Sequence, residues 1–105
     1  MGKIKRNNIL KDVNGVDIDG VAGPITSETI DLGDYYAYAV QVNATSVGTV
    51  TLEVSNDQVN WILKEEVDGD APIGIDVCGT AFRYARITVD TGADVQIFFS
   101  AKASE

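Results

Sequence analysis

An alternation of apolar and polar residues with a period of two runs through most of this 105-residue chain, and it constrains the fold more than any other feature. Between Tyr36 and Asn43, aromatic and β-branched side chains alternate with small or polar ones. The same alternation recurs in residues 49–55, 61–67, 73–77, 82–89 and 95–101. Successive side chains of a strand point to opposite faces of a sheet, so each run predicts a strand with one packed face.

Turn-forming residues separate these runs. Glycine, aspartate and proline mark turns near residues 48, 68–72, 79 and 90–94, and the runs on either side of 90–94 predict an antiparallel hairpin. No segment combines the apolar period of 3.6 residues with the capping residues of an amphipathic helix. The sequence therefore predicts an all-β fold, an antiparallel β-sandwich or jelly roll of about seven to nine short strands.

Length and composition bound the class of protein. A chain of 105 residues is near the commonest single-domain size, so one core is expected. The lone Cys78 excludes an intrachain disulfide, and its place between an apolar run and Gly79 predicts a small buried side chain. The chain has no apolar stretch of about eighteen residues and no apolar segment typical of a secretory signal near its start. We therefore expect a soluble protein, made in the cytoplasm, with no membrane partner.

Charge is distributed unevenly along the chain, whose formal net charge is −8 from 8 basic and 16 acidic residues. The first eleven residues contain only basic charges, those of Lys3, Lys5, Arg6 and Lys11. Residues 12–105 therefore hold 4 basic and 16 acidic residues, a net charge of 4 − 16 = −12. This asymmetry predicts an extended basic N-terminal arm at residues 1–12, attached to an acidic β-sandwich domain at residues 13–105.

Two roles fit a basic segment on an acidic body. It can be a solubilising start to an ordinary domain, or it can leave the domain and dock on an acidic surface of a neighbouring copy or of a larger assembly. In the second role Ile4, Ile9 and Leu10 are expected to be apolar anchors, while the four basic side chains meet acidic groups. Nucleic acid is a weaker partner, because the acidic body repels phosphate.

The residue inventory argues against an enzyme. Without histidine, a serine or cysteine triad that needs an imidazole base is impossible, and the commonest zinc ligand is missing. Acidic groups at residues 12–19 and 68–70 offer oxygen ligands for calcium, but neither has the spacing of an EF-hand loop. Two carboxylates can still approach as in a glycosidase, although domains this small seldom carry such a cleft. We expect no catalytic residue, metal or cofactor.

The most distinctive string runs from Gly48 to Trp61 and contains the turn Ser55, Asn56 and Asp57. Short polar side chains can bond the local backbone and hold such a turn. Trp61 has two possible roles, a stacking platform for a sugar ring or an apolar plug at the end of the core. Since a single tryptophan opening an alternating strand is usually packed, we expect Trp61 to be buried.

A second string, from Phe82 to Ile87, carries Arg83 and Arg86. Two arginines on one strand can bind an anionic ligand. In a body of such negative charge we expect them to pair with nearby carboxylates instead.

Together these strings resemble a group of small bacteriophage virion proteins, of capsid-decoration or head- and tail-accessory type, over about residues 27–100. The matching residues are Asp31-Leu32-Gly33, Tyr35 to Tyr38, Gly48-Thr49-Val50, Ser55-Asn56-Asp57, Trp61 and Tyr84-Ala85-Arg86. Gln58 departs from the pattern, because similar turns often carry glycine there. The resemblance implies a structural component of a phage particle and transfers no catalytic residues.

From the resemblance and the arm we predict a capsid-associated protein, a decoration or minor head protein that is located in the virion. It is expected to be a homo-oligomer bound through its arm and subunit contacts to the major capsid protein or another virion protein. The alternative is a carbohydrate-binding or host-surface-binding module. That module is expected to expose Trp61, Tyr35 or Tyr36 in a row, whereas a structural protein is expected to bury Trp61.

Overall fold

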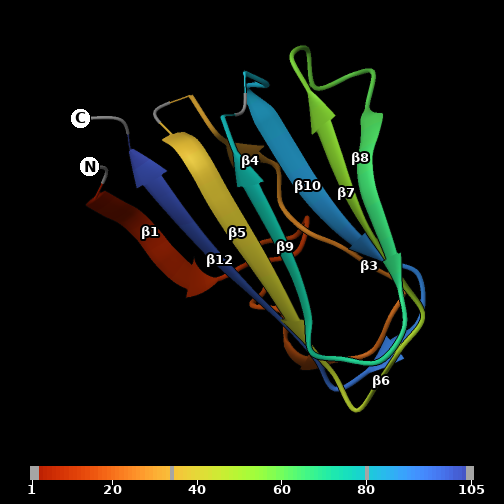
Figure 1. Cartoon of the computed structure of the whole chain (residues 1–105). Helices are drawn as coiled ribbons and strands as arrows, with labels where there is room; N and C mark the ends of the chain where they lie inside the picture. Colours follow the sequence, from red (N-terminus) through yellow and green to blue (C-terminus); the bar gives the residue numbers. More distant parts are fainter. Residues whose placement is uncertain (1–2, 34, 80, 104–105) are drawn as a thin grey trace.

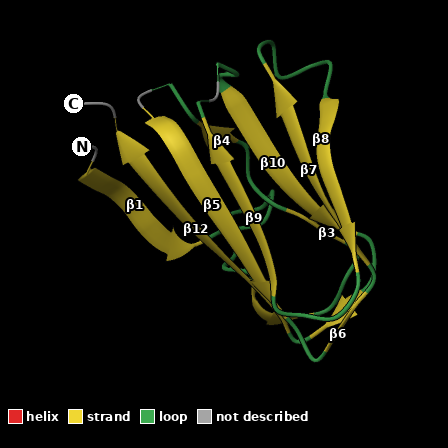
Figure 2. Cartoon of the chain, viewed as in Figure 1, coloured by secondary structure: helices red, strands yellow, loops and turns green. Residues whose placement is uncertain are grey.

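The computed structural model describes residues 3–33, 35–79 and 81–103, and this part of the chain folds into β-strands with no helix (Figures 1 and 2). It therefore has no helix long and apolar enough to cross a membrane. The strands are β1 (Lys3–Ile9), β2 (Asp19–Val21), β3 (Ile25–Thr26), β4 (Ile30–Asp31), β5 (Tyr35–Asn43), β6 (Ser46–Val47), β7 (Thr49–Ser55), β8 (Ile62–Asp68), β9 (Ile73–Cys78), β10 (Tyr84–Val89), β11 (Gly92–Ala93) and β12 (Val95–Ala103).

Two antiparallel sheets make up the body of the protein. Sheet 1 has the order β1-β12-β5-β9, and the short β2 continues the β1 side of β12. Sheet 2 has the order β3-β10-β7-β8, and β4 pairs with the same side of β10 as β3. A small two-stranded sheet, β6 with β11, lies at one end.

The strand order is that of a jelly roll. With β3 and β4 taken as one interrupted strand and β2, β6 and β11 left aside, sheet 1 contains the first, eighth, third and sixth strands in that order. Sheet 2 contains the second, seventh, fourth and fifth. This arrangement is built from two Greek keys. The predicted all-β fold is confirmed, and the topology resolves the choice between a simple sandwich and a jelly roll.

The inner faces of both sheets supply one hydrophobic core. In β10, Ala85, Ile87 and Val89 are fully buried, whereas the intervening residues are half-buried. In β12, Phe99 is fully buried, and its ring centroid lies 5.8 Å from that of Tyr38 in β5. The radius of gyration of 12.9 Å is that of one compact domain of about 100 residues, as the length predicts.

The basic segment at the start of the chain is a strand of this body. β1 pairs with β12 along its length, with one irregularity between Ile4 and Arg6. The next residue, Leu10, is fully buried, and its backbone N–H donates to the carbonyl of Ile97 at 2.8 Å. The division into an arm at residues 1–12 and a separate body is therefore corrected, because residues 3–9 form the first strand of the jelly roll.

Two of the residues predicted to contact a partner have contacts within this chain instead. Leu10 is in its own core rather than on a neighbour, and Lys11 forms a 2.8 Å ion pair with Asp17 of the same chain. The remaining predicted contact residue with a described side chain, Ile9, is half-buried. The other side chains of the predicted arm, those of Lys3, Ile4, Lys5 and Arg6, lie outside the described part of the structure, so their contacts with a partner stay a prediction.

Candidate functional site

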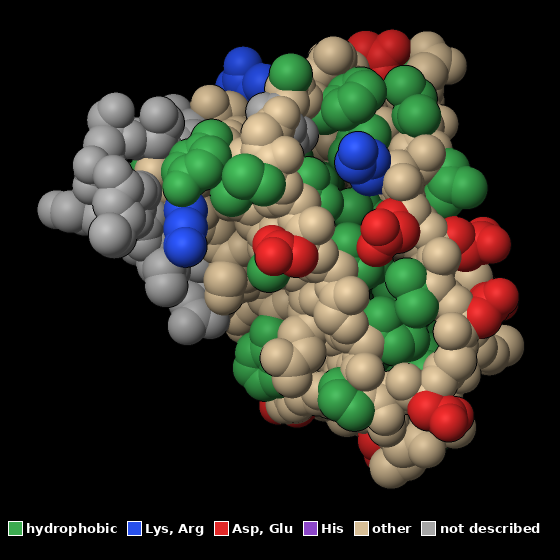
Figure 3. Space-filling view, viewed as in Figure 1, with side chains coloured by type: hydrophobic (Ala, Val, Ile, Leu, Met, Phe, Trp, Pro, Cys, Tyr) green, Lys and Arg blue, Asp and Glu red, His purple; other side chains and the backbone are tan. Residues whose placement is uncertain are grey.

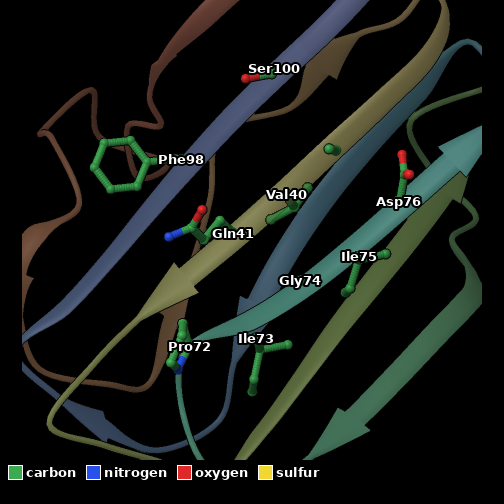
Figure 4. A pocket seen from close by; sticks show the side chains of 10 residues that line it. Val40, Gln41, Pro72, Ile73, Gly74, Ile75, Asp76, Phe98 and Ser100 are labelled. Carbon is green, nitrogen blue, oxygen red and sulfur yellow. The ribbon is translucent and has the colours of Figure 1, made fainter.

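A shallow hollow of about 770 Å³ lies on the outer face of sheet 1 (Figure 4). Its floor is low because Ala39 of β5 lies between Ser100 of β12 and Asp76 of β9 in the strand register. In the next row Phe98 and Gly74 flank β5. A large ring, a carboxylate and small residues thus surround an open surface, a mixture suited to contact with another molecule.

A second hollow of about 240 Å³ continues the first toward the other end of the sheet, since both are lined by Ala39, Asp76 and Ser100. It adds Tyr36 and Lys102, so the whole groove carries an acidic and a basic group.

Cys78 also lines this second hollow, and it is exposed. The prediction that Cys78 is buried is therefore wrong. In β9 the buried parity is that of Ile73 and Ile75, and Cys78 has the opposite parity.

Trp61 packs on the outer face of sheet 2 instead of plugging the core. It is half-buried, and the guanidinium carbon of Arg86 lies 4.2 Å from the centroid of its ring. The same guanidinium forms a 3.0 Å ion pair with Glu53. The prediction that Trp61 is buried in the core is wrong, because an arginine on the outer face offers the indole a cation–π contact there.

This placement also bears on carbohydrate binding. Tyr36 lines the groove on sheet 1, while Trp61 covers Arg86 on sheet 2. Tyr35 packs against the core. The three aromatics therefore do not form the exposed row that we expect of a carbohydrate-binding module.

Both arginines of the 82–87 string pair with carboxylates, as predicted. Besides the Arg86–Glu53 pair, Arg83 forms a 3.1 Å ion pair with Asp31 of β4. The hydrogen bond from Arg83, together with the backbone N–H of Gly33, holds the pKa of Asp31 below its usual value. The remaining residue of the motif, Tyr84, is half-buried, and the guanidinium of Arg83 lies 5.6 Å from its ring centroid.

The Ser55-Asn56-Asp57 turn is held by its side chains, as predicted. The buried hydroxyl of Ser55 accepts hydrogen bonds from the backbone N–H groups of Asp57 and Gln58 at 3.1 and 3.0 Å, and it donates to the carbonyl of Asn60 at 2.7 Å. The side-chain oxygen of Asn56 accepts from the backbone N–H of residue 83 at 2.9 Å, which ties the turn to β10. Gln58 has a φ of 62°, the left-handed conformation in which glycine is favoured.

Replacing Ser55 with alanine is expected to lower the free energy of unfolding by about 1–3 kcal/mol, because the change leaves buried polar groups without a partner. Urea unfolding of the variant measures this loss. Ser46→Ala, at an exposed position of β6, is the matched control and is expected to change stability little. Equal effects of the two substitutions would show that the Ser55 hydroxyl does not organise the turn.

Carboxylates in turns make the fold sensitive to acid. The backbone N–H groups of Asn60 and Val59 hold the pKa of Asp57 well below its usual 3.8, and a bond from the Thr49 backbone lowers that of Asp90. A pKa that is lower in the folded state means that the ionised form stabilises the fold. This contribution is complete above the unfolded value and is lost as pH falls below it.

We therefore expect thermal stability to fall as the pH is lowered from 5 to 2, and Asp57→Asn to reduce the size of this fall. Melting temperatures of both proteins at matched ionic strength across that range provide the measurement. Parallel pH profiles for the wild type and the variant would contradict a contribution from Asp57.

Tyr38 carries an orphaned polar group inside the core. Its side chain is 2% exposed, and its hydroxyl has no hydrogen-bond partner in the described part of the chain. Burial, with a smaller effect of the Glu65 charge, raises the pKa of this hydroxyl to about 12. The hydroxyl therefore stays protonated at neutral pH.

Tyr38→Phe is expected to raise the free energy of unfolding by about 1 kcal/mol, because it removes a buried polar group that gains nothing in return. Tyr84→Phe, at a half-buried position of β10, is the control and should be nearly neutral. Both values come from urea unfolding. A loss of stability in Tyr38→Phe would instead reveal a partner for the hydroxyl.

β8 is more exposed than the alternation at residues 61–67 predicts. Its apolar residues Ile62 and Leu63 are 53% and 56% exposed, and Val59 in the preceding turn is 77% exposed. The run at 61–67 predicts a half-buried strand, but β8 is the last strand of sheet 2 and has a neighbour on one side only. The signal was the break in alternation at Trp61-Ile62-Leu63, where three apolar residues are consecutive.

The acidic loop considered for calcium uses its carboxylates internally. A side-chain oxygen of Asp12 accepts from the backbone N–H groups of Asn14 and Val16 at 2.8 and 3.0 Å, and Asp17 pairs with Lys11. Among the described residues, no three acidic, cysteine or histidine side chains are grouped so that they could hold a metal ion.

No protein-family model and no curated protein sequence matches this chain. Among solved structures, the SPBc2 prophage-derived protein YomS has a similar fold, with a TM-score of 0.72. The match covers 98% of this chain and 96% of that chain, at 8% sequence identity. At this identity the likeness is one of fold alone. It extends over nearly the whole of both chains, so most of the segment that forms β1 belongs to the shared architecture.

Proposed function

We propose that this chain is a non-enzymatic structural protein of a bacteriophage particle, a capsid-associated protein of the decoration or minor head type. The observation that carries the proposal is the whole-chain likeness in fold to a prophage-derived protein, with a TM-score of 0.72. Jelly rolls occur in viral capsid proteins and in lectins. The dispersed aromatics favour the first of these roles over the second.

The proposed partners are the major capsid protein or another virion protein, together with further copies of this chain. A stable interface buries about 800 Å² on each partner. The described chain has an accessible surface of 5761 Å², so it has room for more than one such contact. The groove on sheet 1 and the outer strands of the two sheets are the surfaces that support this proposal.

Adding the purified protein back to particles assembled without it tests the proposal. We expect saturable binding that cosediments with the particles and that weakens at high salt if the basic residues of β1 contribute. A variant with its hollow filled, Ala39→Trp, compared with Ala22→Trp in an exposed loop, shows whether the groove makes this contact. Failure of the wild type to bind particles, combined with saturable binding to a glycan array, would overturn the proposal in favour of a carbohydrate-binding module.

A further inference from the structure

Each sheet ends in two edge strands, and the two with the highest charge, β1 and β8, lie on opposite sides of the molecule. β1 ends sheet 1 and pairs with β12, whereas β8 ends sheet 2 and pairs with β7, and the described residues place no strand beyond either (Figure 1). An edge strand can add a strand of another chain through its outward-facing backbone groups, so each edge is a potential docking site.

These two edges have opposite charge. β1 contains three basic residues and no acidic one. β8 contains one basic residue, Lys64, against Glu65, Glu66 and Asp68, so its net charge is 1 − 3 = −2. Figure 3 shows acidic side chains gathered along the margin of the molecule where β8 lies.

The described residues do not neutralise the acidic charge of Glu65 and Glu66 in β8. Glu65 and Glu66 are exposed and form no hydrogen bond or ion pair with any described residue. The same strand exposes more than half of Ile62 and of Leu63. A strand with free carboxylates beside an uncovered apolar pair has the composition of an interface with a basic partner.

Charge of this kind also restricts which edges can meet. Two β8 edges repel each other, and so do two β1 edges, whereas β1 of one copy and β8 of another attract. We propose that copies of this protein assemble head to tail, with the basic β1 edge of one copy docked on the acidic β8 edge of the next. Because the two docking edges differ, such a contact generates a closed ring or a filament rather than a two-fold dimer.

This inference rests on the proposed function, since it names the subunit contact that a particle protein would use. Native mass spectrometry and sedimentation velocity of the full chain at low salt are expected to show oligomers larger than two. The same protein at high salt is expected to shift toward the monomer, because exposed charges are screened within about 8 Å at physiological ionic strength and within less at higher salt. A wild-type protein that is monomeric or strictly dimeric at low salt would overturn the proposal.

Charge reversal on each edge sharpens the test. Glu65→Lys with Glu66→Lys reverses β8, and Lys3→Glu with Lys5→Glu reverses β1. Each double variant is expected to need an about 100-fold higher concentration for half-assembly, because like charges then face each other. The control for the β8 variant, Asp17→Lys with Asp19→Lys, makes the same change of net charge at exposed positions in and just before β2, and is expected to assemble as the wild type does.

Mixing the two reversed proteins separates a lost contact from a lost fold. In the mixture, basic β1 meets acidic β8 and acidic β1 meets basic β8, so large assemblies are expected to return. Circular dichroism checks that each variant is folded. Folded variants that assemble as the wild type does, or that stay apart when mixed, would overturn the edge-to-edge contact. If the charge tests fail but the wild type still binds particles, only the edge-to-edge contact is wrong and the proposed function stands. If the protein assembles as expected but does not bind particles, the proposed function is wrong instead.

Discussion

Removal of residues 1–11 is expected to lower the free energy of unfolding by about 3 kcal/mol or more, because it deletes a strand of the body and the fully buried Leu10. Without β1, one side of β12 has no partner over most of its length. If the segment were an arm outside the body, its removal would leave the free energy of unfolding unchanged. Urea unfolding of the full-length and shortened proteins at equal concentration distinguishes the two.

A point variant measures how much of this loss of stability comes from the side chain of Leu10. Leu10→Ala alone is expected to cost about 2–5 kcal/mol, which is typical of a buried leucine. Val13→Ala, three residues later and 67% exposed, is the control and is expected to change stability by about 0.5 kcal/mol or less. If the shortened protein is as stable as the full-length one, residues 1–11 are not part of the folded body and form an arm instead.

Phe99→Ala is expected to cost about 3–5 kcal/mol, a large part of the stability of a domain of this size. Phe99 is fully buried near the middle of β12, between β1 and β5, and its ring packs against Tyr38. The neighbouring residue supplies the matched control. Phe98 points to the outer face of sheet 1, where it is half-buried at the groove, and Phe98→Ala is expected to cost about 1 kcal/mol or less.

Chemical denaturation of the two variants, monitored by tryptophan fluorescence and circular dichroism, gives both values. Trp61 lies on the outer face of sheet 2, away from both substitutions, so its fluorescence reports the unfolding of the whole domain. Similar losses in Phe98→Ala and Phe99→Ala would contradict the assignment of the inner and outer faces of β12.

The alternation of side chains predicted the strands because each of them packs one face on a shared core. In β5, β7, β10 and β12 the apolar parity of the sequence is the buried parity of the structure. The pairing of strands was not predictable in this way. The hairpin expected across residues 90–94 is wrong, because β10 lies in sheet 2 and β12 lies in sheet 1. Which strands are neighbours depends on contacts between segments far apart in the chain, such as β1 with β12, and a single sequence carries no direct record of them.

The basic charge near the start of the chain fits two structures, an extended arm and an outer strand. An outer strand is paired along one edge only and tolerates charged side chains, so a basic strand and a basic arm look alike in sequence. Leu10 distinguishes the two structures, because this leucine just before a polar turn is buried and anchors the strand to its own core.

The surfaces followed from the sequence only in part. The polar turn at Ser55 was predictable because its hydrogen bonds depend on local spacing. The ion pairs of Arg83 and Arg86 were predictable because the chain has an excess of acidic residues. The groove on sheet 1 was not, because its low floor arises where small residues of three strands come into register. Trp61 was misplaced for a similar reason, since its partner Arg86 is distant in the chain.

The proposed function depends on the presence of this protein in the assembled particle. Quantitative mass spectrometry of phage particles released by cells that carry the gene for this chain, purified through a density gradient, tests this directly. The protein is expected to band with the particles at a fixed ratio to the major capsid protein. Recovery of the protein only in the soluble fraction, with intact particles free of it, would contradict a structural role in the virion.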